Sequence, residues 1–274
     1  MSKQKNITDE ELLDILQLLL HQYGYDFLQY SQASLKRRIL HFMDVMHINN
    51  AYDLKFNLTN HKGSFIQFLE TVTVNTTDMF RDPPFYKTIR EKILPELATY
   101  PIIKIWHAGC ATGEEVFSLS ILLHEEQLLN RCQIYATDLN SINLDRAAKG
   151  IIPLRNMKEY IRNYRESGGK NDFSSYYTAR YDYVMIDKAL RKNIVFSHHN
   201  LVTDNVFNEF QLILCRNVLI YFNSLLQNKV INLLYNSLSP LGYLALGIKE
   251  SLLFTDLNSK FESVYPALKI FKRR

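Results

Sequence analysis

The chain has 274 residues, of which 47% are hydrophobic and 22% are charged, and its formal net charge is +4. This composition is typical of a globular protein with one or two domains and excludes a wholly disordered chain. The apolar runs are shorter than the roughly 18 residues of a membrane span, and so small a charge excess does not indicate a nucleic-acid partner.

The first 70 residues follow a helical pattern. Thr8 and Glu11 are spaced as in a capping box, an apolar stripe follows, and Gly24 marks a helix end. The polar, acidic start does not match a secretion signal. Three further helices are predicted over residues 31–46, 50–58 and 63–72. We therefore expect an all-helical N-terminal domain over residues 1–74.

Beyond residue 75, strands and helices alternate. The apolar run 102–106 is typical of a buried parallel strand, and it leads into a turn that contains Gly109 and Gly113. A helix and a second strand follow, and this strand ends at Asp138. The other predicted elements are a helix over 116–129, strands over 132–137, 210–214 and 243–246, and a helix over 224–238. This order indicates a doubly wound nucleotide-binding sheet.

An aromatic-rich segment near 173–195 interrupts this alternation and is predicted to form a small antiparallel β insertion. The expected fold class is therefore α/β. An all-helical N-terminal domain precedes a Rossmann-like domain over residues 75–274, which carries the insertion.

The glycine turn is the first candidate for ligand binding. Gly109 and Gly113 permit a tight turn, but the following Glu114 and Glu115 would repel a pyrophosphate. Two carboxylates suit a ligand with an ammonium group, such as S-adenosylmethionine (SAM). Asp138, 25 residues after Gly113, has the spacing of a carboxylate that binds ribose hydroxyls. Each feature also occurs in loops that bind nothing, and together they favour an adenosine-containing ligand.

Other polar clusters have ordinary explanations beside functional ones. The segment 74–82 is rich in Asn, Thr and Arg, and Asn75 or Thr77 would suit a helix cap. The cluster Lys36–Arg38 fits a solvated helix face or a contact with an acidic protein.

Metal and disulfide chemistry are not expected. His198 and His199 are adjacent, so on a strand they would point to opposite faces. The three cysteines are widely spaced and odd in number, which indicates neither a disulfide framework nor a zinc ligand set and suits a reducing cytoplasm. They are Cys110, Cys132 and Cys215.

Five short motifs are spread along the chain. They are Asn75-x-Thr77-x-x-Phe80-Arg81, Gly109-Cys-Ala-Thr-Gly113-Glu-Glu115, Ala136-Thr-Asp138, Asn200-Leu201 and Cys215-Arg216-Asn217-Val-Leu-Ile-Tyr221-Phe222. In order and spacing they resemble the CheR family of chemotaxis receptor methyltransferases, over nearly the whole chain. The resemblance implies a cytoplasmic SAM-dependent protein-glutamate O-methyltransferase. It would esterify glutamates on the cytoplasmic helices of chemoreceptors and release S-adenosylhomocysteine.

The resemblance also implies roles for single residues. Asn75, Thr77 and Arg81 would lie over the cofactor. Glu115 would meet the cofactor's ammonium group, Asp138 its ribose, Asn200 and Leu201 its adenine, and Arg216 and Asn217 its reactive end. Tyr221, with Arg81, would position the substrate, and Arg37 and Arg38 would face the acidic receptor helix.

The chain departs from the family pattern at three places. Met79, Val116 and the run Gly247-Ile248-Lys249-Glu250 stand where the family has Phe, Pro and Gly-His-Ser-Glu.

Two alternatives stay open, a methyltransferase for a non-receptor protein and a SAM-binding regulatory or adaptor module without turnover. An NAD-dependent dehydrogenase is more distant, because the three-glycine fingerprint is incomplete. Since no heptad pattern appears, we expect a monomer.

Overall fold

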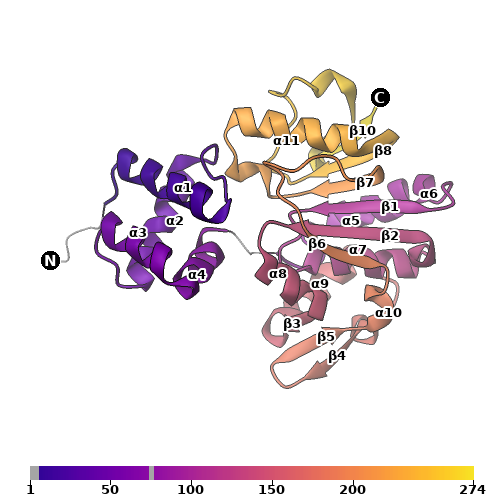
Figure 1. Cartoon of the computed structure of the whole chain (residues 1–274). Coiled ribbons are helices and arrows are strands. Elements are labelled where there is room, and N and C mark those ends of the chain that lie inside the picture. The colour runs from indigo at the N-terminus through magenta and orange to yellow at the C-terminus, as the bar shows by residue number, and fades with distance from the viewer. Residues whose placement is uncertain (1–5, 74–76) are drawn as a thin grey trace. The chain divides into compact units, whose positions relative to one another are not determined.

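A computed structural model describes residues 6–73 and 77–274 (Figure 1). The chain divides into two compact units. Unit 1 comprises Met1–Val74 together with Leu219–Val230, and unit 2 comprises Asn75–Val218 together with Ile231–Arg274. The segment Leu219–Val230, which we expected in the second domain, thus belongs to the first unit. Among the described residues, no helix combines the length and apolar character that crossing a membrane requires.

Unit 1 is built from helices. The Thr8 hydroxyl accepts a hydrogen bond from the Glu11 amide at 3.1 Å, and the Glu11 carboxylate accepts one from the Thr8 amide at 2.8 Å, which forms the predicted capping box. Gly24, with a φ of 75°, ends the same helix. The helices are α1 (Asp9–Tyr23), α2 (Gln32–Val45), α3 (Ala51–Asn60) and α4 (Lys62–Val72).

The late segment of unit 1 pairs with the connection between α1 and α2. Tyr30 and Phe222 form an isolated antiparallel bridge, with ring centroids 4.9 Å apart. The Ser31 amide donates to the Tyr221 carbonyl at 2.8 Å. This segment contains a 3₁₀ turn over Leu219–Tyr221 and the first residues of α11 (Ser224–Ser237).

Unit 2 is a Rossmann-like fold around a seven-stranded sheet with the order β6-β2-β1-β7-β8-β10-β9. The pairs from β6 to β8 are parallel, and β10 is antiparallel to both of its neighbours. Consequently the carboxyl ends of β6, β2, β1 and β7 lie side by side. The strands are β1 (Ile103–Ala108), β2 (Cys132–Asp138), β6 (Ile194–His198), β7 (Phe210–Cys215), β8 (Leu238–Leu246), β9 (Phe261–Tyr265) and β10 (Ile270–Arg273).

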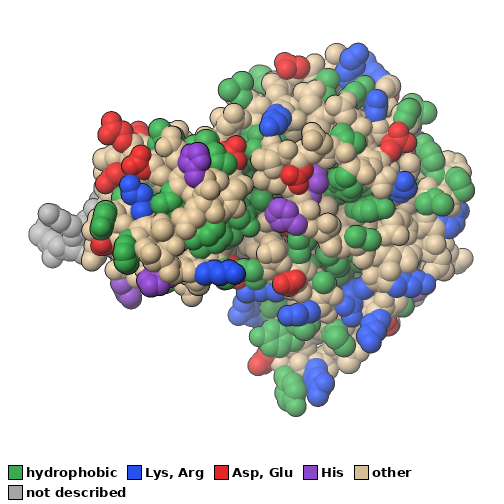
Figure 2. All heavy atoms as spheres, in the orientation of Figure 1, with side chains coloured by type: hydrophobic (Ala, Val, Ile, Leu, Met, Phe, Trp, Pro, Cys, Tyr) green, Lys and Arg blue, Asp and Glu red, His purple; other side chains and the backbone are tan. Residues whose placement is uncertain are grey.

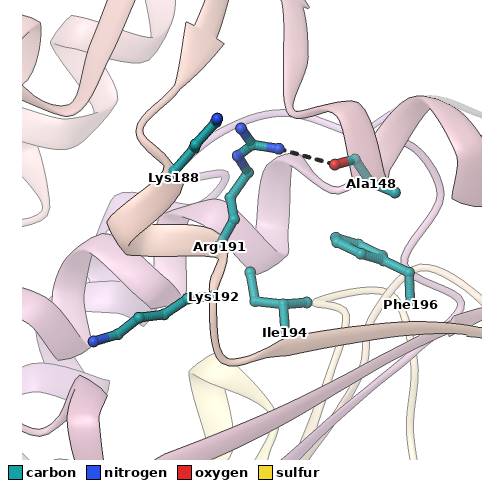
Figure 3. Close-up of a pocket in the computed structure, with 6 residues that line it drawn as sticks. All are labelled: Ala148, Lys188, Arg191, Lys192, Ile194 and Phe196. Carbon is teal, nitrogen blue, oxygen red and sulfur yellow. Dashed lines mark hydrogen bonds between the residues drawn. The ribbon is translucent and has the colours of Figure 1, made fainter.

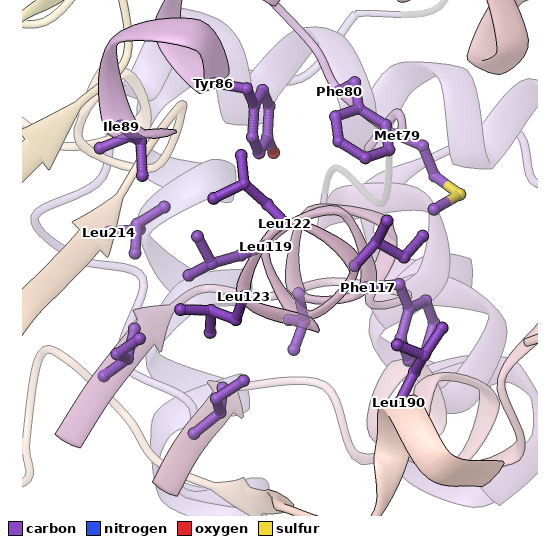
Figure 4. Close-up of a cluster of buried hydrophobic side chains, with 14 of the residues drawn as sticks. Met79, Phe80, Tyr86, Ile89, Phe117, Leu119, Leu122, Leu123, Leu190 and Leu214 are labelled. Carbon is purple, nitrogen blue, oxygen red and sulfur yellow. The ribbon is translucent and has the colours of Figure 1, made fainter. Parts of the chain in front are cut away.

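Helix α7 carries the centre of the core of unit 2. Its apolar residues, among them Phe117, Leu119 and Leu122, are fully buried against the sheet and against the aromatic residues Phe80 and Tyr86 (Figure 4). The helices of this unit are α5 (Pro83–Thr88), a π-helical stretch Ile89–Ile93, α6 (Leu94–Leu97), α7 (Glu114–Glu125), α8 (Ser141–Lys149), α9 (Met157–Glu166) and α10 (Lys188–Arg191).

The small antiparallel sheet is present, but its limits differ from the predicted 173–195. It has the order β3-β5-β4, with β3 (Ile151–Pro153), β4 (Tyr177–Arg180) and β5 (Tyr183–Ile186). Its first strand therefore comes before residue 173, and Ile194 and Val195 belong to β6 of the main sheet. The strands β6, β9 and β10 were not predicted from the sequence.

Candidate functional site

Four sequence motifs follow the carboxyl ends of four neighbouring strands in unit 2. In sheet order they are Asn200-Leu201 after β6, Asp138 at the end of β2, the Gly109–Glu115 turn after β1, and Arg216-Asn217 after β7. The strand order reverses between β1 and β7, and a crevice for ligands forms at such a switch point in open α/β sheets. This edge is therefore the candidate site.

The glycine turn needs glycine at both ends. Gly109 has a φ of 80°, and a Cβ there would lie 2.6 Å from the Cγ2 atom of Val218. Gly113 has a φ of 94°, and a Cβ there would lie 3.0 Å from the Cβ atom of Ala147. Because other residues would be strained as well as crowded, the turn can pass close to its neighbours only with these two glycines. It delivers the chain directly into α7.

Asp138 connects the glycine turn to the loop after β2. Its Oδ2 atom accepts a hydrogen bond from the Ala111 amide at 2.8 Å, and Oδ1 accepts one from the Asn140 amide at 2.8 Å. Burial raises the pKa of Asp138 above its usual value, although these backbone hydrogen bonds oppose the shift. A carboxylate has about four acceptor positions, so this one is held in place and keeps capacity for a further donor.

The two glutamates at the start of α7 have different surroundings. Glu115 lies between two donors, because His107 Nδ1 is 3.0 Å from Oε1 and Arg216 Nη1 is 3.1 Å from Oε2. Burial alone would raise the pKa of Glu115, but the His107 hydrogen bond and the Arg216 charge outweigh it and hold the pKa below its usual value. Glu114, in contrast, is buried with only the Thr112 hydroxyl as a side-chain donor, at 2.6 Å. Glu115 is thus the ionised member of the pair.

This difference gives a testable pH dependence. Burial raises the pKa of Glu114 to about 7, against an ordinary value of 4.5. Between these two pH values the folded chain therefore binds more protons than the unfolded chain. The free energy of unfolding consequently has its full contribution from neutral Glu114 below about pH 4.5 and loses it as the pH rises through about 7. The side chain of Glu114→Gln stays neutral, so between pH 5 and pH 8 the free energy of unfolding of this variant should fall by about 2.5 kcal/mol less than that of the parent chain.

Urea unfolding at both pH values measures this difference. The matched control is Glu159→Gln, which changes an exposed glutamate on α9. Equal pH slopes for the parent chain and Glu114→Gln would contradict the assignment.

Arg216 is a buried cation that joins two loops. Its Nη2 atom lies 2.5 Å from Asp82 Oδ2, and its guanidinium lies 4.1 Å from the centroid of the Phe85 ring. Burial alone would lower the pKa of Arg216, but Glu115, Tyr86 and Asp82 raise it above its usual value. The predicted role at the reactive end of a cofactor stays a prediction. In the structure, Arg216 neutralises Glu115 and fixes the loop that contains Asp82.

Glu250 is a site residue whose role the sequence did not reveal. Its carboxylate is buried and accepts hydrogen bonds from the amides of Asn217 at 3.0 Å, Val218 at 2.8 Å and Gly247 at 2.5 Å. These bonds hold the turn after β7, in which Asn217 has a φ of 61°. His107 was missed in the same way, because only the fold brings it to Glu115.

Arg81 stands between two residues in the left-handed region. Phe80 has a φ of 52° and Asp82 a φ of 60°. The Phe80 amide donates to the Ser118 hydroxyl at 2.8 Å, which anchors this loop on α7. Within the described residues, the Arg81 guanidinium has neither a hydrogen bond nor an ion pair. Neighbouring contacts must hold strained backbone of this kind in place. The loop therefore has a fixed conformation, and its half-buried cation is available to a ligand.

The remaining predicted residues of unit 2 are placed as follows. The Thr77 carbonyl accepts a bond from the Tyr160 hydroxyl at 3.5 Å, and Asn75 lies outside the described residues. Asn200 and Leu201 are both buried, and the backbone amide of Asn200 donates to Asp204 Oδ2 at 2.9 Å. Within the described part of the chain, no group of three or more His, Cys, Asp or Glu residues is arranged to hold a metal ion.

Three predicted residues belong to unit 1. The Arg38 guanidinium lies 4.5 Å from the centroid of the Tyr221 ring, and its Nη1 atom donates to the Val72 carbonyl at 2.7 Å. Arg37, next to it on α2, is exposed and has no partner among the described residues. Arg38 is therefore engaged in holding unit 1 and Tyr221, and Arg37 is the member of the pair that is accessible to a partner.

Two family models together match most of the chain. One, described as the CheR methyltransferase SAM-binding domain, matches residues 75–267. The other, described as the CheR methyltransferase all-alpha domain, matches residues 10–73.

Curated relatives cover the same length. A putative methyltransferase Cher3 from Pseudomonas putida is 45% identical over 273 residues, which is 100% of both chains. A chemotaxis protein methyltransferase from Listeria monocytogenes is 28% identical over 89% of this chain and 91% of its own. Chemotaxis protein methyltransferase 1 from Vibrio cholerae is 29% identical over 94% of each chain. Among solved structures, the N-methyltransferase NodS from Bradyrhizobium japonicum is 15% identical over 71% of this chain and 70% of its own, with a TM-score of 0.34.

Proposed function

The chain belongs to the CheR methyltransferase family, and from this premise we propose that it methylates glutamate side chains of chemotaxis receptors. As a member of this family it is a SAM-dependent methyltransferase with a SAM-binding domain. The identity of the acceptor is the proposed part. The observation that carries the proposal is the row of motifs at the carboxyl edge, where Asp138, Glu115 and Arg216 come from three separate segments of unit 2.

The residues present fit SAM. Asp138, held by two backbone amides, has a carboxylate oxygen available to ribose hydroxyls. Glu115 is an ionised carboxylate at the first turn of α7 and suits an ammonium group, even though it also contacts Arg216. We propose that Asn200 and Leu201 flank the adenine, that Asn75 and Thr77 cover the cofactor, and that Arg216 and Asn217 lie toward its reactive end. When bound, SAM supplies a methyl group activated by the sulfonium.

The proposed acceptor needs no general base. A glutamate side chain has a reference pKa near 4.3 and is already ionised at neutral pH. What remains for the protein is alignment of the carboxylate with the methyl carbon and removal of water, and orientation can contribute roughly 7–11 kcal/mol in well-aligned systems. We propose that Arg81 holds the carboxylate electrostatically and that the Tyr221 hydroxyl steers it. The guanidinium of Arg81 has no partner among the described residues, which supports this role.

The choice of receptors as substrates rests on relatives. Several chains that are 28–30% identical over 89–94% of this one are named chemotaxis protein methyltransferases. We propose accordingly that this protein acts in the cytoplasm, as a monomer, on acidic receptor helices, with exposed Arg37 as one contact.

Transfer of radiolabelled methyl from SAM tests the proposal. The purified chain is incubated with cytoplasmic fragments of chemoreceptors, and the label is expected to appear as esters that mild alkali releases as methanol. Glu→Gln substitutions in the labelled receptor peptides should abolish labelling. Alkali-stable label, or label on other proteins only, would contradict the acceptor. Binding of S-adenosylhomocysteine without any transfer would instead favour the regulatory or adaptor module.

A further inference from the structure

A basic pocket lies in unit 2 between the end of α8, α10 and β6 (Figure 3). Its volume is about 580 Å³, and it is lined by Ala148, Lys188, Arg191, Lys192, Ile194 and Phe196. Every charged side chain of this lining is a cation. In Figure 2, Lys and Arg side chains gather over the part of the face where Figure 1 places α8, α10 and the small sheet. The pocket is therefore suited to an anionic occupant.

Its three cations differ in how firmly they are held. Arg191 is fixed, because its Nε atom donates to the Ile186 carbonyl at 3.1 Å and Nη1 donates to the Ala148 carbonyl at 2.9 Å. Lys188 and Lys192 are exposed and have no partner among the described residues. The neighbouring Asp187 forms no ion pair with them in the described part of the chain, and its carboxylate caps α10 by accepting from the Ala189 amide at 2.8 Å. Two positive charges are thus available at the rim.

The floor of the pocket is the edge of the main sheet. Within residues 6–73 and 77–274, β6 pairs only with β2, in parallel register. The Ile134 amide donates to the Asn193 carbonyl at 2.9 Å, and the His199 amide donates to the Asp138 carbonyl at 3.3 Å. In a strand, successive backbone groups alternate in direction, so residues of the same parity as Asn193 and His199 face β2. The amides and carbonyls of Ile194 and Phe196 therefore face the free edge.

Edge geometry and charge together select the occupant. A free edge offers backbone groups that pair with an added strand. Ile194 and Phe196, two residues apart, place apolar side chains on one face of that edge. We propose that an extended acidic segment of a partner protein adds to β6 as a further strand. Its apolar side chains would pack on Ile194 and Phe196 and its carboxylates would meet Lys188 and Lys192.

The probe for this proposal is a fluorescein-labelled hexapeptide of alternating Glu and Val, titrated into the full chain and followed by anisotropy. Lys188→Glu combined with Lys192→Glu is expected to weaken its binding about tenfold or more. The matched control is Lys158→Glu with Lys260→Glu, which changes the net charge equally at exposed lysines elsewhere in unit 2 and should change the affinity little. Equal loss in both double variants would overturn the proposal.

Two further arms test strand addition in the unmodified chain. The same peptide with alternate backbone nitrogens methylated cannot pair with an edge and should not bind. Hydrogen exchange at the Ile194 and Phe196 amides should slow about tenfold on addition of the parent peptide. Unchanged exchange, or equal binding of the methylated peptide, would overturn the proposal. So would displacement by inorganic phosphate, which would mark a site for small anions, or binding of anionic phosphatidylserine vesicles in place of the peptide.

Discussion

Replacing Asp138 by alanine is expected to weaken binding of S-adenosylhomocysteine by about 10² or more, which corresponds to about 3 kcal/mol. The substitution removes the carboxylate proposed for the ribose. It also removes the acceptor of the Ala111 and Asn140 amides, so the glycine turn loses its tie to β2. Since hydrogen bonds to charged groups contribute about 1.5–3 kcal/mol each, even partial loss of this set is measurable by titration calorimetry.

Two matched variants make the Asp138 result specific. Asp138→Asn keeps the size and one acceptor oxygen, so it should lose less affinity than Asp138→Ala. Asp145→Ala changes an exposed aspartate on the neighbouring α8 and should bind like the parent chain. Unaltered affinity of Asp138→Ala, in a sample that unfolds cooperatively, would mean that the adenosine group binds elsewhere.

Arg81→Ala is expected to lower kcat/KM for methyl transfer by about 10²–10³, the range seen when a preorganised donor is removed from an active site. The reason is that Arg81 is a half-buried cation without a partner among the described residues, on a loop fixed by Phe80 and Asp82. Arg81→Lys keeps the charge but loses the planar pair of donors, so it should recover only part of the rate. Transfer assays at saturating SAM measure both.

Calorimetry separates the two roles proposed for Arg81. If the arginine only covers the cofactor, Kd for S-adenosylhomocysteine will rise while kcat/KM at saturating SAM stays unchanged, and substrate positioning will be excluded. Tyr221→Phe serves as a companion, because it removes one hydroxyl and leaves the ring that Arg38 covers. Full turnover of Tyr221→Phe with unchanged cofactor affinity would show that its hydroxyl does not steer the substrate.

The parts of the fold that were predicted from the sequence are those with a strong hydrophobic pattern. β1 and β7 lie in the middle of the sheet and are almost wholly buried, so their sequences are continuous apolar runs. β6, the strand Ile-Val-Phe-Ser-His, lies at an edge and is half exposed, so its pattern blends into the aromatic insertion before it. β9 and β10 were not predicted for a similar reason, because they are short and half exposed.

The site follows a similar division. Asp138 and the pair Glu114-Glu115 could be proposed from the sequence because they stand at short, fixed distances from a glycine turn within one βαβ unit, and the family resemblance singled out Glu115. Arg216 was predicted at the reactive end of a cofactor, but its ion pairs and the role of Glu250 were not predicted, because both depend on contacts between distant parts of the chain. Arg216 meets Asp82 across 134 positions, and Glu250 meets Asn217 across 33. No local pattern distinguishes such a glutamate from a solvated one.

The pairing of Tyr30 with Phe222 has a consequence for biosynthesis. Unit 1 needs the segment that ends at Val230, which leaves the ribosome 156 residues after Val74, since 230 − 74 = 156. At 5–20 residues per second this delay is about 8–30 s. During that time the first four helices lack their last partner segment, while most of unit 2 is already made. The N-terminal unit is therefore completed late. A fragment that ends at Val74 would contain Tyr30 but lack its partner Phe222.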